Sequence, residues 1–180
     1  MSATLRITNF KQNNIIETAQ IDTAPAVGAT TVELDSNQNF AIGSYVIFGA
    51  LGAEGAELRP LSSVNADGKN VSFSTALLYE HSRFSPVTKL YGNKIKVYRA
   101  PNVDGTPPAD EDYTLVGSAV DIDIDQPYTQ VQDNDGGADY WYKSTYYNST
   151  TLDETSLADS KASRGATPNQ YCSIDDVRKE

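Results

Sequence analysis

Ala138-Asp-Tyr-Trp-Tyr-Lys-Ser-Thr-Tyr-Tyr-Asn-Ser149 is the stretch that decides the fold, because it holds the only Trp and four of the eleven Tyr of the chain. Aromatic and β-branched residues fit a pleated, half-buried surface, so the stretch predicts a central strand. The turn-forming residues 133–137 just before it predict a tight reversal. Alternation along the strand gives two faces, and either can supply the core. One face carries Tyr140, Tyr142, Ser144 and Tyr146, and the other carries Trp141, Lys143, Thr145 and Tyr147.

The segments around this strand have a recognisable order. Candidate strands at 94–100, 113–116 and 128–133 precede it, and the segment 154–162 follows it. They contain Val97-Tyr98-Arg99, then Tyr-Thr-x-x-x-Asp from 128 to 133, then Tyr-x-Tyr-x-x-x-Tyr-x-Asn-Ser from 140 to 149. This order resembles the second half of a fibronectin type III or immunoglobulin-like sandwich over Lys94 to Arg164. The resemblance implies an all-β sandwich and leaves the function open, because such modules serve many functions.

The first strands of that sandwich are not found immediately before Lys94. Two apolar-rich runs at 4–8 and 14–21 are the better candidates, separated by a polar turn. We therefore expect the N-terminal runs to complete the sandwich and the middle of the chain to be an insertion, whose two ends must lie close together.

The middle segment predicts a small barrel or rolled sheet. Candidate strands at 29–34, 45–49, 57–64 and 70–74 are separated by Gly-containing turns. From Val27 to Leu90 the order Gly-Ala-Thr-Thr-Val-x-Leu, Asn-Phe-Ala-x-Gly-x-Tyr-Val-x-Phe-Gly and Ala-Glu-Leu-x-x-x-x-Ser-Val resembles a small β-module frequent in tailed-bacteriophage virion proteins. The expected division is N-terminal strands in 1–24, a barrel-like module in 25–92, a sandwich in 93–164, and a linker with a C-terminal tail in 165–180.

The balance of charged residues limits the classes of partner that the chain can bind. With 14 Lys and Arg against 24 Asp and Glu, the formal net charge is −10, which argues against a direct grip on nucleic acid. No apolar run is long enough to span a membrane, and the N-terminus does not read as a secretory signal. Cys172 is the only cysteine, so an intrachain disulfide is impossible and folding in a reducing cytoplasm is expected.

Residues for catalysis are sparse, and we expect no enzyme and no cofactor. His81 is the only histidine, and its surroundings lack a nucleophile-elbow pattern. The alternating run 121–125 places three carboxylates on one strand face. A Ca²⁺ site at Asp133, Asp135 and Asp139 is an alternative to a plain hairpin turn, although the spacing does not match an EF-hand.

The two Pro-rich stretches read as surface connections. Residues 101–112 hold three prolines and several acids, so they predict an exposed loop. After the linker at 165–170, a Ser N-cap followed by acids predicts a short helix. Its start resembles the opening helix of phage head–tail connector proteins. That resemblance implies an interface formed by Ser173, Ile174, Asp175, Asp176, Val177 and Arg178.

Together these resemblances predict a non-enzymatic structural protein of a tailed-phage virion, assembled in the host cytoplasm. It would dock onto other virion proteins, and onto copies of itself, at the head–tail connector, neck or tail. A capsid decoration protein is the alternative position. A module of another class, an adhesive or carbohydrate-binding β-sandwich, would instead expose a row of aromatic rings.

Overall fold

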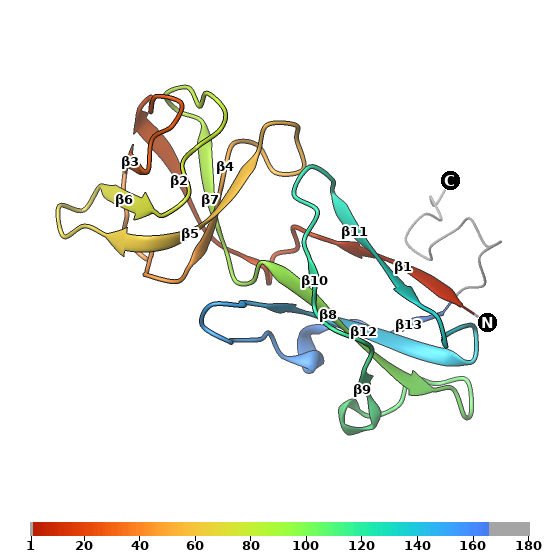
Figure 1. The fold of residues 1–180 in the computed structure, drawn as a ribbon. Helices are drawn as coiled ribbons and strands as arrows, with labels where there is room; N and C mark the ends of the chain where they lie inside the picture. The colour runs from red at the N-terminus through yellow and green to blue at the C-terminus, as the bar shows by residue number, and fades with distance from the viewer. Residues whose placement is uncertain (1, 166–180) are drawn as a thin grey trace, which may run out of the picture.

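The computed structural model describes residues 2–165, and the regular secondary structure of this part of the chain is almost entirely β-strand (Figure 1). The strands up to the midpoint are β1 (Ala3–Thr8), β2 (Ile15–Thr23), β3 (Thr31–Leu34), β4 (Tyr45–Phe48), β5 (Glu57–Val64), β6 (Asn70–Phe73), β7 (Pro86–Leu90) and β8 (Lys94–Pro101). The others are β9 (Thr114–Leu115), β10 (Val120–Asp121), β11 (Tyr128–Asp133), β12 (Tyr140–Tyr147) and β13 (Ser163–Arg164), with single 3₁₀ turns η1 (Asp110–Asp112) and η2 (Leu157–Asp159). Within residues 2–165, no helix has the length and apolar character needed to cross a membrane.

Six strands close into a barrel in the order β2-β3-β6-β5-β4-β7, and every pair is antiparallel. The period of two explains the core, because Val46 and Phe48 of β4 point into the barrel while Ile47 points out of it. Strand closure leaves the barrel without a sheet edge. The barrel core consists of Ala19, Ile21, Val32, Leu34, Phe40, Val46, Phe48, Leu61, Val71, Phe73, Leu77 and Val87.

The barrel corrects one expectation about the N-terminus. Only the first N-terminal run, β1, pairs with β11. The second run, β2, is a barrel strand that pairs with β3 at one end and β7 at the other. The physical reason is that the other five strands leave β3 and β7 as open edges, and the nine-residue β2 closes the barrel by pairing with both.

The second half of the chain, together with β1, builds two sheets that share one core. β1 and β11 form a two-stranded sheet, and a five-stranded sheet runs β10-β8-β12-β13 with β9 also on β8. The aromatic strand β12 is central, as expected, since it lies between β8 and β13. Its Tyr142 and Tyr146 point into the shared core, so the face with Trp141 is the outer one. The core residues are Ala3, Ile7, Ile95, Val97, Ile122, Val131, Tyr142 and Tyr146.

Buried asparagines join the barrel to the sheets. Asn14 donates to the Asn9 carbonyl at 2.9 Å and accepts the Gly92 N–H at 3.0 Å. Asn148 donates to the Gly43 carbonyl of the barrel at 3.1 Å. Gly92 itself has no room for a side chain, because a Cβ there would lie 2.5 Å from the Tyr147 nitrogen. The joint is therefore set by hydrogen bonds and close backbone contact, beside a small apolar cluster around Ile47 and Leu90.

Candidate interaction site at the barrel end

The barrel buries one carboxylate, that of Glu57 at the start of β5, whose residue is only 2% exposed. It accepts the backbone N–H groups of Leu78 at 2.9 Å and Tyr79 at 2.9 Å. It also contacts His81 Nε2 at 3.1 Å and forms an ion pair with Arg59. A buried charge is stable only when it is paired and hydrogen-bonded. Together these partners supply the ion pair and the hydrogen bonds that the Glu57 carboxylate requires.

Arg59 extends the same network. Its guanidinium donates to the carbonyls of Thr75 at 3.0 Å and Ala76 at 2.9 Å. Two barrel side chains thus hold the backbone of the β6–β7 loop at four points. We call Glu57, Arg59 and His81 the loop latch.

Electrostatics keep the latch charged. Burial alone would raise the pKa of Glu57, but the N–H groups of Leu78 and Tyr79, the His81 contact and the charge of Arg59 together lower it. Glu57 is therefore ionised at neutral pH. The carboxylate oxygens of Glu57 accept hydrogen bonds from the loop backbone, so the Glu57–His81 pair holds that loop in place.

The latched loop carries apolar side chains into solvent. Leu78 is 68% exposed, Tyr79 54% and Phe84 62%, and Val27 of the neighbouring β2–β3 loop is 54% exposed. The two loops lie together, because Gly28 N–H donates to the Leu77 carbonyl at 2.8 Å. Figure 1 shows both loops at the same end of the barrel. We call Val27, Leu78, Tyr79 and Phe84 the barrel-end patch.

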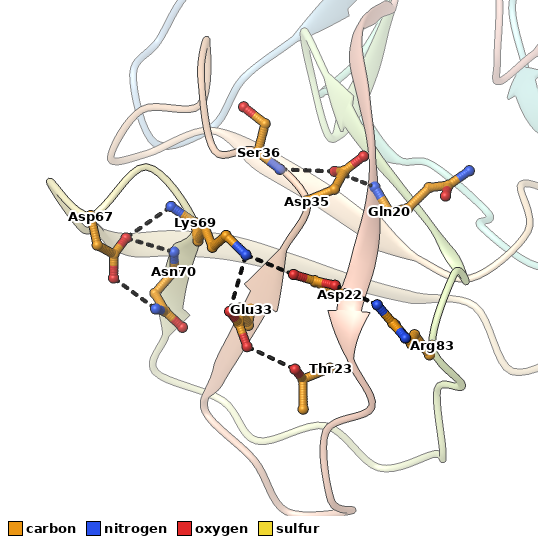
Figure 2. Close-up of polar contacts among 10 residues, drawn as sticks. All are labelled: Gln20, Asp22, Thr23, Glu33, Asp35, Ser36, Asp67, Lys69, Asn70 and Arg83. Carbon is orange, nitrogen blue, oxygen red and sulfur yellow. Dashed lines mark hydrogen bonds and ion pairs between the residues drawn. The ribbon is translucent and has the colours of Figure 1, made fainter.

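A network of charged and polar side chains lies on the barrel surface (Figure 2), and it includes Arg83, the chain neighbour of Phe84. Asp22 of β2 binds Lys69 at 2.7 Å and Arg83 at 3.1 Å, while Lys69 also reaches Glu33 at 3.5 Å. Hydrogen bonds from Lys69 and Arg83 lower the pKa of Asp22. These pairs are exposed, so each contributes little to stability, but together they link β2, β3 and the base of the latched loop.

The β5–β6 turn next to this network is fixed by its own aspartate. Asp67 accepts the N–H groups of Asn70 at 2.9 Å and Lys69 at 2.8 Å, and the Asn70 side chain at 2.7 Å. These bonds lower the pKa of Asp67 to about 2. The carboxylate acts as a turn cap of the kind Asp commonly supplies.

The outer face of the five-stranded sheet holds a second polar cluster. Glu154 binds Lys96 at 2.6 Å, Tyr98 at 2.5 Å and Thr145 at 2.6 Å. Burial raises the pKa of Tyr98 to about 12, with a further contribution from Glu154. The cluster attaches the segment after β12 to the face of β8 and β12, since Glu154 also pairs with Tyr147.

The aromatic rings of this outer face are covered by cations. The Arg164 guanidinium lies 5.3 Å from the Trp141 ring centre, and Lys96 lies 3.9 Å from that of Tyr147. The flat faces of these rings therefore already have partners within the chain.

The aspartates considered for Ca²⁺ are used otherwise. Asp133 is 4% exposed and accepts two bonds of 2.8 Å from Arg99 and one of 3.0 Å from the Tyr142 hydroxyl. It also accepts the N–H of Asp135 at 3.1 Å. Asp135 and Asp139 are exposed. Across residues 2–165, no three His, Cys, Asp or Glu side chains are grouped so that they could hold a metal ion.

The expectation of one acidic strand at 121–125 is wrong. β10 ends at Asp121, which pairs with Lys94 at 2.9 Å. Ile122 turns into the core, and the chain then reverses through a bond from Gln126 N–H to the Asp123 carbonyl at 3.2 Å. Burial of Ile122 thus sets the direction of the backbone after Asp121, and the three carboxylates do not share a strand face.

The remaining expected site residues fall into two groups. His81 belongs to the loop latch described above. Cys172 and the expected tail helix with its interface, Ser173, Ile174, Asp175, Asp176, Val177 and Arg178, lie outside the described residues.

Sequence reasoning missed the loop latch and the exposed ring of Phe84. Glu57, Arg59 and His81 are spread over 25 positions of chain, and nothing in their spacing indicates that they meet. The turn signal around Ser82-Arg83-Phe84-Ser85-Pro86 was available, but the exposure of Phe84 depends on how β6 and β7 are placed. Comparisons of the chain with protein-family models, curated proteins and solved structures find no match.

Proposed function

We propose that this chain is a non-enzymatic structural protein of a tailed-phage virion, which docks onto other particle proteins at the head–tail connector, neck or tail. The observation that carries the proposal is the latched barrel end. Three buried or half-buried polar side chains, Glu57, Arg59 and His81, support a loop that exposes Leu78, Tyr79 and Phe84 among polar residues. An exposed apolar patch on a fixed support is typical of a protein-binding surface.

The chemistry of the same residues supports binding over catalysis. His81 is the only histidine in the chain, and it is bonded to a carboxylate that also holds two backbone N–H groups. Proton transfer by His81 would compete with the bonds that fix the loop. The resemblance of residues 27–90 to a small phage virion module supplies the class of particle.

We further propose that the two sheets form an immunoglobulin or fibronectin type III-like sandwich. Support comes from the antiparallel pairing of β8 with β12, the short β13 on the far side of β12, and the facing sheet of β1 and β11 over a shared core. In that arrangement β1 supplies a strand from outside the contiguous segment 93–164.

Capsid decoration is the alternative position in the particle. An adhesive or carbohydrate-binding role is less well supported, because Trp141 and Tyr147 on the outer sheet face carry Arg164 and Lys96 over their rings.

The test is the content of purified particles from the phage or prophage whose genome encodes the chain. Quantitative mass spectrometry should find the chain's peptides co-purifying with the particles in constant ratio to the other structural proteins. Immunogold labelling at the head–tail joint would support the connector position, and labelling over the head would support decoration. A chain that is abundant in the lysate yet absent from intact particles would contradict the proposal.

A further inference from the structure

The two-stranded sheet has an unpaired edge along β1. β11 lies on one side of β1, and no other strand of residues 2–165 pairs with its far side (Figure 1). The bond of 3.0 Å from Asn9 N–H to the Pro127 carbonyl continues the register of β1 and β11 and sets its hydrogen-bond phase. Hydrogen-bonded positions alternate along an antiparallel ladder, so the odd-numbered residues of β1 bond to β11. The N–H and C=O groups that point away from β11 are those of Thr4, Arg6 and Thr8.

Two of these three residues have both backbone groups free. The Thr8 carbonyl accepts the Tyr146 hydroxyl. Within residues 2–165, no side chain, loop or turn bonds to the backbone of Thr4 or Arg6. We call the N–H and C=O groups of Thr4 and Arg6 the β1 edge. Both residues are exposed, so the edge is accessible.

The other edges of the paired sheets carry features that usually prevent strand addition. β9, β10 and β13 have two residues each, and very short edge strands pair poorly. β11 directs the charged Asp133 toward the core, which is a second such feature. β1 has six residues in an uninterrupted register and contains no Pro, Gly or Lys. Among the described strands of these sheets, β1 is therefore the one that best accepts a further strand.

The side chains beside the β1 edge define the chemistry of that strand. Leu5 points toward the core but stays half-buried. Arg6 lies on the outer face, where it stacks 4.3 Å from the Tyr128 ring centre and donates to the Tyr128 hydroxyl at 2.9 Å. It has no ion pair with any residue in 2–165. The outer face of the sheet has no acid, since it consists of Thr4, Arg6, Thr8, Tyr128, Gln130 and Gln132.

An added antiparallel strand would bond to Thr4 and Arg6 and place its own residues opposite them on the outer face. The residue between these two would point inward beside Leu5, where an apolar side chain is favoured. Opposite charges stabilise a directly opposed pair, so the residue facing Arg6 should be acidic. The β1 of a second copy cannot supply this acid, because its sequence is Ala-Thr-Leu-Arg-Ile-Thr.

We propose that an extended segment of another polypeptide pairs antiparallel with β1 through the β1 edge. The segment carries an acidic residue opposite Arg6, followed by an apolar residue beside Leu5. Backbone hydrogen bonds supply the affinity, and the alternate side chains supply the specificity. The inference goes beyond the proposed function, because it concerns a surface remote from the latched loop and its test needs no particle.

The first measurement is hydrogen exchange of the full chain alone. The Thr4 and Arg6 amides should exchange rapidly, while the Leu5 and Ile7 amides, which bond to β11, should be protected. Equal protection of all four amides would show that the β1 edge is already covered and would overturn the proposal.

The second measurement is a titration of the ¹⁵N-labelled full chain with the peptide acetyl-Thr-Val-Glu-Val-Thr-Val-Thr-amide. Its Glu opposes Arg6, and the following Val lies beside Leu5. Amide shifts should be largest on β1, with a dissociation constant of about 1 mM. Absence of shifts up to about 10 mM peptide would overturn the proposal.

Thr4→Pro should weaken this binding at least tenfold, because proline removes one outward N–H. Its bonds to β11 are unaffected, since Pro is tolerated on an edge strand where the N–H faces solvent. Gln132→Pro is the matched control: Gln132 lies directly opposite Thr4, and its N–H points to the far edge of β11. It should bind the peptide as wild type does. Equal losses in both variants would overturn the assignment to β1.

Charge exchange tests the position of the acid without altering the backbone. A peptide with Lys in place of Glu should bind wild type about two- to fivefold more weakly, and Arg6→Glu should reverse this preference. No reversal would overturn the proposed register. Light scattering gives the remaining outcome: a mass that rises from 19.5 kDa toward twice that value, and falls back in Thr4→Pro, would identify a second copy as the occupant and overturn the proposal.

Discussion

The barrel and the paired sheets each bury a carboxylate, and the two carboxylates hold different kinds of structure. Glu57 of the barrel is 2% exposed and binds mainly backbone N–H groups of one loop. Asp133 of the sheets is 4% exposed and binds side chains, those of Arg99 on β8 and Tyr142 on β12, from a strand of the facing sheet. The first carboxylate fixes a loop on a barrel that is already closed, whereas the second joins two sheets that face each other over a shared core.

Replacing Glu57 should give the largest effect. Glu57→Gln keeps the shape but removes the charge that Arg59, with a side chain only 11% exposed, depends on. We expect a loss of about 3 kcal/mol in the free energy of unfolding and a fall of roughly 6–12 °C in melting temperature. Hydrogen exchange should increase first at the Leu78 and Tyr79 amides. Glu54→Gln, an exposed neighbour, is the control and should change stability little.

The comparison would break if Glu57→Gln opened the barrel strands and the loop to exchange equally. That result would mean that the latch is part of the barrel's own closure, and the distinction between loop support and sheet joining would not hold.

Asp133→Asn should have the next largest effect. The amide retains one acceptor oxygen but loses the charge that binds Arg99, whose side chain is 25% exposed and can regain some water. We expect a loss of about 2 kcal/mol in unfolding free energy, measured by urea titration. Exchange should rise on both β1–β11 and β8–β12, because the contact spans two sheets. Asp135→Asn, which is exposed, should be near neutral, and a change confined to the 133–137 turn would contradict the joining role.

How far the sequence predicts this comparison depends on the range of the interactions. Alternation and turn signals predict most of the strands, including β3, β5, β6 and the central β12, because those patterns are local. The place of β2 in the barrel could not be predicted, since joining β3 and β7 is a long-range choice. The face of β12 was undetermined for the same reason, because it depends on where β1 and β11 lie.

The polar contacts were less predictable than the strands. Asp133 attracted attention as a turn residue, but its partner Arg99 lies 34 positions away. The joint made by Asn14 and Asn148 left no pattern at all, because an Asn that bonds to a distant backbone group resembles any turn Asn in the sequence. Tertiary structure decides which polar groups are buried. A function that depends on such groups therefore cannot be predicted from the sequence alone.

Acid should reduce the stability of both halves, by a smaller amount than either substitution. The pKa values of Glu57 and Glu154 are lowered in the folded chain by hydrogen bonds and nearby cations that outweigh burial. Their contribution is complete above the unfolded value of about 4.3 and is lost as the pH falls through the folded value. Urea midpoints should therefore be flat from about pH 7 to pH 5 and fall below about pH 4.

The substituted chains sharpen the acid prediction. Glu57→Gln should lose less stability than wild type between pH 5 and pH 3. Glu54→Gln should follow the wild-type curve. Equal pH dependence in all three chains would show that Glu57 does not couple proton binding to folding.

Alkali should destabilise the paired sheets and not the barrel. The expected change in the free energy of unfolding near pH 10 is smaller than those expected for the substitutions and for acid. Burial raises the pKa of Tyr98, Tyr142 and Tyr146 to about 12, and Tyr142 also donates to Asp133. All three belong to the five-stranded sheet. A raised tyrosine pKa stabilises the fold below the unfolded value of about 10, and this contribution is lost as the pH rises toward 12. At pH 10 the loss is a few tenths of a kcal/mol for each residue.

The measurement is the ultraviolet absorbance of tyrosinate during a pH titration, with the near-ultraviolet circular dichroism recorded in parallel. Tyr98, Tyr142 and Tyr146 should ionise only as the sheet signal is lost. Tyr142→Phe should remove one late-ionising group and leave the bond between Arg99 and Asp133 in place. If all tyrosines of the folded chain ionised together near pH 10, the sheet core would be open to water, and Asp133 could not hold the two sheets in the way that distinguishes it from Glu57.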